Sequence, residues 1–299
     1  MQIPIPAFIS VIRPRQCIKN VLVWAGLFFG LSDKHQHICF STALENTFLA
    51  FIAFCFIAGA VYIMNDIHDA ECDRVHEEKR KRPIASGALP KWVATIEAGV
   101  LLVLSIVIGA YVDMALLGCL MLYFMLQVLY TLWLKRVVIV DVFMIAAGFV
   151  LRVYSGAVAA GVDASNWMLV CTFSVALLLA MCKRYNELTV LGDHAVEHRR
   201  VLGEYSKELL VTLIAAVSSL SVVCYSIYTL SPTTIEKLGT RQMFITIPFV
   251  AFGIFRYVYL TLCKGQGGRP EKTLTQDIAI VVDVILFIGV CALIMIFKG

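Results

Sequence analysis

Long runs of apolar residues divide the chain, and shorter polar stretches separate them. Most of the runs have about 17 to 22 residues, the length that an α-helix needs to cross the hydrocarbon core of a bilayer. The pattern predicts nine membrane-spanning helices, at residues 20–32, 47–64, 93–110, 114–133, 138–160, 166–182, 209–230, 242–263 and 278–297. No polar stretch is long enough for a soluble domain. Residues 1–299 are therefore expected to form a single integral membrane domain of the all-α class.

The composition agrees with this prediction. Of the 299 residues, 60% are hydrophobic and only 15% are charged, which is far too apolar for an ordinary soluble domain. Residues 1–10 lack the basic start and the small-residue cleavage site of a signal peptide, so we expect nothing to be removed there. The 10 cysteines occur singly, without a Cys-x-x-Cys pair, and predict neither a zinc site nor a disulfide framework.

Basic residues are distributed unevenly between alternate loops. If the nine predicted helices cross in turn, nineteen of the 25 Lys and Arg residues fall on one side of the membrane and four on the other. Loops rich in Lys and Arg stay in the cytoplasm. We therefore expect the N-terminus on the cytoplasmic side of the cell (cytoplasmic) membrane and the C-terminus on the outer side. Two long charged loops, 65–91 and 183–208, then form helical caps on the cytoplasmic face, where we expect the active site.

The stretch 65–82 contains the densest cluster of acidic and basic groups. Asp66, Asp69 and Asp73 occupy positions i, i+3 and i+7, which on a helix places three carboxylates on one face, with Asn65 beside them. Like charges this close repel one another unless they share a cation. Hard oxygen ligands in small number suit Mg2+, which completes its shell with water and substrate phosphate. We therefore expect these four residues to be metal ligands and catalytic residues.

A block of cations follows the carboxylates directly. It consists of Arg74, Lys79, Arg80, Lys81 and Arg82. Guanidinium and ammonium groups bind phosphate, so the stretch as a whole predicts a site for a diphosphate at the membrane surface. The alternative is a solvated loop whose basic residues only set the topology. A random loop has no reason to place three Asp at helical spacing, and this favours the site.

The sixth predicted helix runs into a second polar segment. Lys183, Arg184 and Glu187 have helical spacing and could share a face, although cations at a cytoplasmic helix end are also what topology alone predicts. Asp193 and Glu197 are either a second metal-binding pair or an ordinary acidic pair in a polar loop.

Two arginines and two aspartates lie within predicted helices. Arg152 and Arg256 would be costly in lipid and should face the interior of the bundle. Asp141 and Asp283 are candidate partners for them or groups that line a cavity. For Arg256 and Asp283 we favour a purely structural role, as an ion pair or as a side chain that snorkels to the membrane surface. Arg152 stands among small residues that allow close helix packing, and we expect it to contact substrate.

The motif Asn65-Asp66-x-x-Asp69-x-x-x-Asp73, the nine predicted helices and the second charged loop resemble the UbiA superfamily of intramembrane prenyltransferases. Segments 13–20, 65–87, 141–156, 183–187 and 255–257 resemble its decaprenyl-phosphate phosphoribosyltransferase branch, and the resemblance covers nearly the whole chain.

Two features depart from related sequences. Cys17 stands where the branch usually has an aromatic residue, a change that we expect to affect packing. Aromatic prenyltransferases carry a second Asp-x-x-x-Asp motif after the sixth helix. Here Lys183, Arg184 and Glu187 precede only a loose Asp193-x-x-x-Glu197, which supports the phosphoribosyl branch.

The resemblance implies a reaction. The 5-phosphoribosyl group of phosphoribosyl diphosphate is transferred to a polyprenyl (decaprenyl) phosphate, with Mg2+ as cofactor and diphosphate as product. In the resembling enzymes the lipid product leads to decaprenyl-phospho-arabinose for cell-envelope polysaccharide. We expect no nucleic-acid partner. The candidate substrate-binding residues are Lys19, Lys79, Arg80, Arg82, Arg152, Lys183, Arg184, Glu187 and Tyr205, with Glu187 and Tyr205 assigned to ribose hydroxyls.

Two other functions remain as alternatives. The first is a UbiA-type aromatic prenyltransferase, which joins an allylic polyprenyl diphosphate to an aromatic acceptor; it needs fewer cations and a second acidic motif. The second is a transporter or a structural membrane protein without catalysis. Broken helices at corresponding positions of two halves would favour a transporter, and the sequence does not show them clearly.

Overall fold

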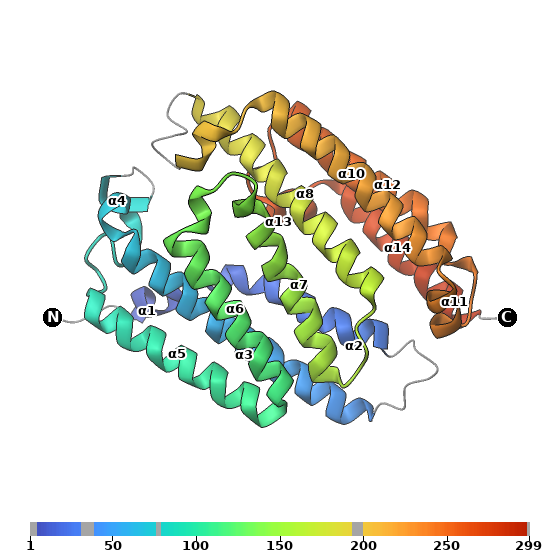
Figure 1. Ribbon diagram of the computed structural model, residues 1–299, viewed down its shortest axis with the longest axis horizontal. Helices are drawn as coiled ribbons and strands as arrows, with labels where there is room; N and C mark the ends of the chain where they lie inside the picture. Colours follow the sequence, from blue (N-terminus) through green and yellow to red (C-terminus); the bar gives the residue numbers. More distant parts are fainter. Residues whose placement is uncertain (1–4, 31–38, 76–78, 193–199, 298–299) are drawn as a thin grey trace. The chain divides into compact units, whose positions relative to one another are not determined.

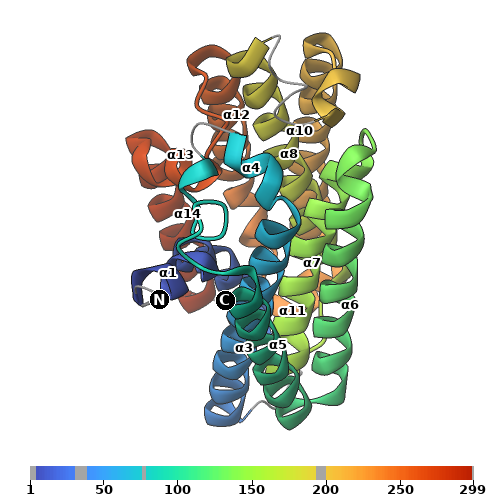
Figure 2. The ribbon, with the colours of Figure 1, turned by 90° about the vertical axis from the view of Figure 1, so that its left-hand side faces the viewer.

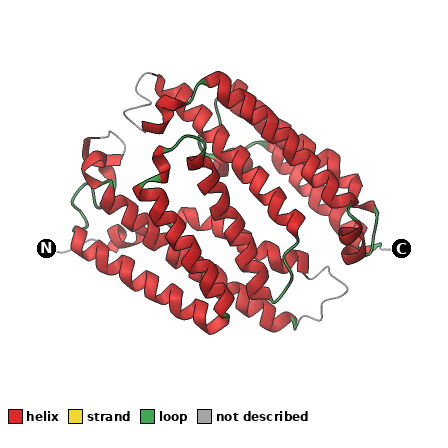
Figure 3. Cartoon of the chain, viewed as in Figure 1, coloured by secondary structure: helices red, strands yellow, loops and turns green. Residues whose placement is uncertain are grey.

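The regular elements of this computed structural model, which describes residues 5–30, 39–75, 79–192 and 200–297, are all helices (Figures 1 and 3). None of the described residues forms a strand. In chain order the elements are α1 (Ile5–Ile12), η1 (Pro14–Val23), α2 (Trp24–Gly30), α3 (Phe40–His68), α4 (Ala70–Val75), η2 (Lys79–Lys81), α5 (Lys91–Val112), α6 (Met114–Leu132), η3 (Leu134–Arg136), α7 (Val140–Ala160), α8 (Asn166–Leu191), η5 (Arg200–Glu204), α10 (Lys207–Leu230), α11 (Pro232–Leu238), η6 (Gln242–Thr246), α12 (Ile247–Lys264), α13 (Pro270–Gln276) and α14 (Ile278–Ile296). The prediction of an all-α fold is confirmed.

Eight helices within the described ranges are long and apolar enough to cross a membrane. They are α3, α5, α6, α7, α8, α10, the continuous stretch Gln242–Lys264 that ends in α12, and α14. These eight correspond to the second to the ninth predicted helices. The protein is therefore a multi-pass membrane protein.

The first predicted helix, residues 20–32, is not found as one helix. Pro14–Val23 form a 3-10 helix, and α2 adds only seven residues before the described range stops at Gly30. One reason is polar. Asn20 is buried in this stretch, and its side chain accepts a hydrogen bond from Arg152 at 2.8 Å. The count of nine membrane-spanning helices is therefore not confirmed.

The contacts group the chain into two compact units. The first comprises residues 1–30, 38–132 and 151–163, and the second comprises 31–37, 133–150 and 164–299, so that α7 contributes residues to both. In the first unit α5 runs alongside α3, as Figures 1 and 2 both show. In the second unit α8 packs along α10. The prediction that residues 1–299 form one domain stays a prediction.

Helix α5 packs against α3 through small and polar residues and turns its larger apolar residues outward. Ala94, Leu101, Ser105 and Gly109 are the buried residues of α5, and the Ser105 hydroxyl donates to the carbonyl of Ala53 on α3 at 3.0 Å. The other faces of α5 carry exposed apolar side chains, among them three valines, Ile96 and Leu104. Lipid tails are as apolar as these side chains, so close packing and interhelical hydrogen bonds decide which face turns inward.

A second close contact holds the N-terminal segment against α7 in the first unit. A Cβ atom on Gly156 would collide with the carbonyl oxygen of Val23, and one on Gly26 would collide with the backbone of Ala157. Only glycine lets two backbones approach this closely. The contact places η1 beside Arg152, and it places Arg13 near the end of α3.

Candidate active site

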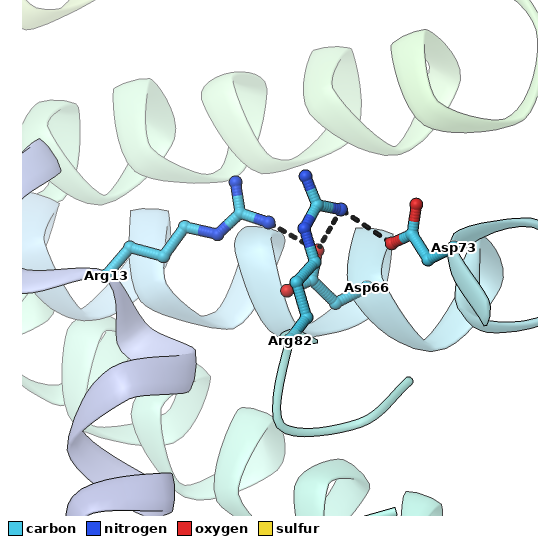
Figure 4. A network of polar contacts seen from close by, with 4 residues as sticks. All are labelled: Arg13, Asp66, Asp73 and Arg82. Atoms are coloured by element: carbon cyan, nitrogen blue, oxygen red, sulfur yellow. Dashed lines mark hydrogen bonds and ion pairs between the residues drawn. The ribbon is translucent and has the colours of Figure 1, made fainter. Parts of the chain in front are cut away.

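Two buried carboxylates near the end of α3 share one arginine (Figure 4). Asp66 belongs to α3 and Asp73 to α4, and their exposed fractions are 2% and 4%. Nη1 of Arg82 donates to Oδ1 of Asp66 at 3.1 Å and to Oδ2 of Asp73 at 2.6 Å. Nη2 of Arg13 donates to the same Oδ1 of Asp66 at 2.5 Å. Of the three carboxylates predicted to share a face, Asp66 and Asp73 are therefore brought together, with two guanidinium groups as their counter-charges.

The local backbone explains how the two carboxylates meet. Helix α3 ends at His68, but the Asp69 N–H still donates to the Asn65 carbonyl and the Asp73 N–H to the Asp69 carbonyl, both at 2.9 Å. The helical register therefore continues through Asp69, which closes α3 as its C-terminal cap. A short turn at η2 then returns the chain, where the Arg82 N–H donates to the Lys79 carbonyl at 2.9 Å.

Arg13 contributes to this cluster although it is absent from the predicted site residues. Its backbone lies in the left-handed region, with φ 57° and ψ 64°, which costs a residue with a side chain about 1–2 kcal/mol. Its guanidinium group also lies 5.3 Å from the centre of the Tyr62 ring, within the range of a cation–π contact. Strain of this kind is a recurring feature of functional sites. In the sequence, Arg13 stands directly before Pro14 and begins segment 13–20, which carries part of the family resemblance, but neither signal assigned it to the site.

The oxygen donors of this cluster fit a hard divalent cation. Among the described residues, no three His, Cys, Asp or Glu side chains lie close enough to hold a metal ion by themselves. Mg2+ does not require three, because it is commonly held by one or two carboxylates together with water and substrate phosphates. Asp66 and Asp73 supply such a pair, and the half-buried Asn65 and Asp69 stand beside them in the chain.

Three further predicted phosphate ligands belong to the same unit. Lys19 lies in η1 and is half-buried, Lys79 begins η2 and is also half-buried, and Arg80 is exposed. Cations of this kind could bind phosphate oxygens close to the carboxylate pair.

Arg152 is 5% exposed inside the first unit. Its Nε donates to Oδ1 of Asn20 and its Nη2 to the hydroxyl of Tyr123, both at 2.8 Å. The guanidinium group also lies 4.8 Å from the Tyr123 ring centre and 5.9 Å from that of Phe54. The prediction that Arg152 faces the interior is confirmed, and its contact with substrate stays a prediction.

A second buried polar cluster lies in the second unit. Arg184 is 1% exposed, and its Nε donates to Oδ2 of Asp141 at 2.7 Å, while its Nη1 donates to Oε2 of Glu187 at 2.5 Å. The Tyr205 hydroxyl donates to Oδ1 of Asp141 at 2.7 Å and accepts from the Ile139 N–H at 2.8 Å. We refer to these five residues as the Asp141 network. The partner of Asp141 is therefore Arg184 and not Arg152, which was one of the candidates.

The backbone of this network is strained at one point. Ile139 has φ 68°, a conformation that is a genuine outlier for a β-branched residue. Burial, together with the hydrogen bond to Asp141, raises the pKa of the Tyr205 phenol above its ordinary value. Tyr205 therefore keeps its proton near neutral pH and remains a donor to the carboxylate.

Four other charged residues were singled out in the sequence: Arg256, Asp283, Asp193 and Glu197. Arg256 donates from Nη2 to Oδ2 of Asp277 at 2.9 Å, so it forms an ion pair, but its partner is Asp277 and not the candidate Asp283. This hydrogen bond lowers the pKa of Asp277 below its ordinary value. Asp283 lines a cavity between α12 and α14 that Arg256 and Asp277 also line. Asp193 and Glu197 lie outside the described residues.

Comparison with known proteins places the chain in a family. A sequence model of the UbiA prenyltransferase family matches residues 22–276. The chain belongs to this family. The match covers the carboxylate pair of Asp66 and Asp73 and all five residues of the Asp141 network.

Relatives within the UbiA family are similar over nearly the whole chain. The decaprenyl-phosphate phosphoribosyltransferase of Mycolicibacterium smegmatis is 31% identical over 95% of this chain and 91% of its own length. The enzyme of the same name from Corynebacterium glutamicum is 32% identical over 90% of this chain and 80% of its own. Among solved structures, a UbiA homolog from Archaeoglobus fulgidus bound to GPP and Mg2+ has a TM-score of 0.72 at 17% identity, covering 95% of this chain and 97% of that one. At that identity the likeness shows the UbiA fold alone.

Replacement of Arg82 by Met should destabilise the folded protein by about 1–3 kcal/mol, because two buried carboxylates lose a charged donor. The neighbouring Arg80 is exposed, so Arg80→Met is a matched control that should change stability by less than about 0.5 kcal/mol. The midpoint of thermal unfolding in detergent measures both. Equal midpoints for the two variants would contradict the shared ion pair as a source of stability.

Proposed function

We propose that this UbiA-family protein transfers the 5-phosphoribosyl group of phosphoribosyl diphosphate to a polyprenyl phosphate. The observation that carries the proposal is the identity of about a third, over at least 90% of the chain, to two enzymes named decaprenyl-phosphate phosphoribosyltransferase. The geometry supports it independently, because a buried carboxylate pair stands among cations, as a diphosphate with a divalent metal requires.

The reaction exchanges one oxygen substituent for another at C1 of the ribose. The bond from C1 to the diphosphate oxygen breaks, and its electron pair leaves with diphosphate. An oxygen of the lipid phosphate supplies the pair for the new bond. That phosphate is already an anion near neutral pH, so the reaction needs no general base and we assign none.

In the first unit the proposed roles follow from position. Asp66 and Asp73, with Asn65 and Asp69, would hold Mg2+, which neutralises charge on the diphosphate leaving group when it is bound. Arg13 and Arg82 hold the two carboxylates in place. Lys19, Lys79 and Arg80 would bind phosphate oxygens, and Arg82 would join them once Mg2+ takes its place at the carboxylates.

In the second unit the cation that we assign to substrate is Lys183, which is half-buried at the last turns of α8. Lysine at such a position acts as a compact positive charge that binds a phosphate oxygen. Arg152, in the first unit, remains a proposed substrate contact whose guanidinium group is already oriented by Asn20 and Tyr123.

We also propose that the carboxylate pair lies at the cytoplasmic face of the cell membrane. This proposal is supported by the uneven distribution of Lys and Arg, which favours the side that holds residues 65–91. Phosphoribosyl diphosphate carries many charges and cannot cross lipid unaided, so a site that uses it must open to the compartment that supplies it.

Purified enzyme in detergent should transfer label from phosphoribosyl diphosphate into the lipid fraction when polyprenyl phosphate and Mg2+ are present. Asp66→Asn and Asp73→Asn should each reduce the rate by about 100-fold or more, because charge on the leaving group is no longer neutralised. The matched control is Glu71→Gln, since Glu71 lies on α4 with its side chain 84% exposed. It should stay within about twofold of the wild type.

The same preparation is tested with geranyl diphosphate and 4-hydroxybenzoate. If the benzoate becomes prenylated and the phosphoribosyl label stays in water, the enzyme is an aromatic prenyltransferase and the proposal is wrong. Transfer that persists in EDTA or in both Asp variants would contradict the metal site.

Two native cysteines report the orientation of α3. Cys39 precedes the helix and Cys72 lies in α4 beyond its other end, and both are exposed. A hydrogen bond from Ser41, and others from Thr42, lower the pKa of Cys39 to about 7, so much of it is reactive thiolate at neutral pH. In single-cysteine variants, an impermeant maleimide should label Cys39 in intact cells and Cys72 only in inverted vesicles. The reverse pattern would place the carboxylate pair outside the cell.

A further inference from the structure

The Asp141 network leaves little hydrogen-bonding capacity for a substrate at two residues first assigned to substrate binding. Arg184 is 1% exposed, and two of its nitrogen atoms donate to carboxylates. The Tyr205 hydroxyl donates its only proton to Asp141 and accepts from the Ile139 N–H. A substrate can bind only to groups that it can reach. The Arg184 guanidinium group and the Tyr205 hydroxyl are enclosed within the second unit.

The network joins three segments that are distant in the sequence. Ile139 directly precedes α7 and Asp141 lies in its first turn, Arg184 and Glu187 lie on α8, and Tyr205 directly follows η5. The apolar surroundings join the same segments, since Tyr205 packs with Val201 and Leu210, and Val138, Tyr185 and Leu188 lie against them. Any shift of the α7 start would therefore move the last turns of α8.

The strained residue shows which contact holds the arrangement. Ile139 keeps φ 68°, which an isoleucine adopts only when its surroundings compensate. Its N–H donates to the Tyr205 hydroxyl, and Asp141, two residues later, accepts from that same hydroxyl. A single oxygen atom thus fixes both the strained backbone and the carboxylate that orients Arg184.

We propose that the Asp141 network is a positioning device, in which Tyr205 and Arg184 fix the end of α8, and with it Lys183, without contacting substrate. The proposal rests on the proposed function for its kinetic consequence. On α8, Glu187 lies one turn beyond Lys183, so the carboxylate that Arg184 holds stands beside the lysine. Arg184, Glu187 and Tyr205 are then positioning residues for phosphoribosyl transfer.

The test uses Tyr205→Phe, which keeps the ring and removes only the hydroxyl. The expected result is a fall in kcat of about tenfold with an unchanged KM for phosphoribosyl diphosphate, because misplacement of a substrate-orienting group lowers the rate of the bound complex. The matched control is Tyr257→Phe. The Tyr257 hydroxyl is buried and has no hydrogen-bond partner within the described residues, so its loss should leave kcat and the unfolding midpoint unchanged.

A second substitution at Ile139 makes the test specific to the strained backbone. Glycine adopts φ 68° without strain, so Ile139→Gly in the Tyr205→Phe background should recover most of the lost kcat and of the lowered unfolding midpoint. Ile139→Val keeps the β-branched side chain and should recover neither. Recovery by glycine alone supports the positioning device.

Several results would overturn the proposal. A raised KM with unchanged kcat in Tyr205→Phe would mean that the hydroxyl contacts substrate, as would a kcat loss that glycine at 139 does not repair. If the wild type transfers no phosphoribosyl group, the proposed function fails. The unfolding midpoints then still test whether the Asp141 network holds this part of the protein in place. A lowered midpoint in Tyr205→Phe that Ile139→Gly repairs supports the network, and an unchanged midpoint overturns it.

Discussion

A buried charge in a membrane protein must find an opposite charge within the protein, and this constraint organises both polar clusters described above. Asp66 and Asp73 are almost completely buried, so their stability depends on Arg82 and Arg13. Asp141 is fully buried and depends on Arg184. Removing one partner from such a pair leaves an uncompensated charge, which is far more costly than the pair itself. Each cluster of charges therefore holds distant segments of its own unit against one helix end.

Both clusters consist of arginine–carboxylate ion pairs, but they serve different purposes. At Asp66 the counter-charges are partly accessible, with side chains of Arg13 and Arg82 that are 30% and 26% exposed. A metal ion and a diphosphate can therefore replace arginine–carboxylate contacts with metal–carboxylate and arginine–phosphate contacts, and the total charge stays balanced. At Asp141 the arginine is enclosed, so the pair stays closed and serves to hold helices in register. Exposure of the guanidinium groups separates a site that can exchange partners from one that cannot.

The sequence was sufficient for features that depend on local spacing. Apolar runs predicted nine membrane-spanning helices, of which eight are found among the described residues, and the helical spacing predicted that Asp66 and Asp73 would lie together. Features that depend on distant contacts were missed or assigned wrongly. Arg13 joins Asp66 across 53 positions and Asp141 joins Arg184 across 43, and no periodicity encodes such pairs. Residues 20–32 were apolar enough for one helix, but in residues 20–30 a 3-10 segment precedes a short α-helix, where Asn20 accepts from Arg152 and Val23 lies against Gly156.

The central claim is that Asp66 and Asp73 hold the divalent metal that binds the diphosphate of the donor. Electron paramagnetic resonance tests it most directly, with Mn2+ in place of Mg2+ and phosphoribosyl diphosphate as the ligand. We expect bound Mn2+ with resolved coupling to phosphorus in the wild type and in Glu71→Gln, and loss of both signals in Asp66→Asn and Asp73→Asn. Undiminished metal binding and phosphorus coupling in the two Asp variants would place the metal elsewhere and contradict this account.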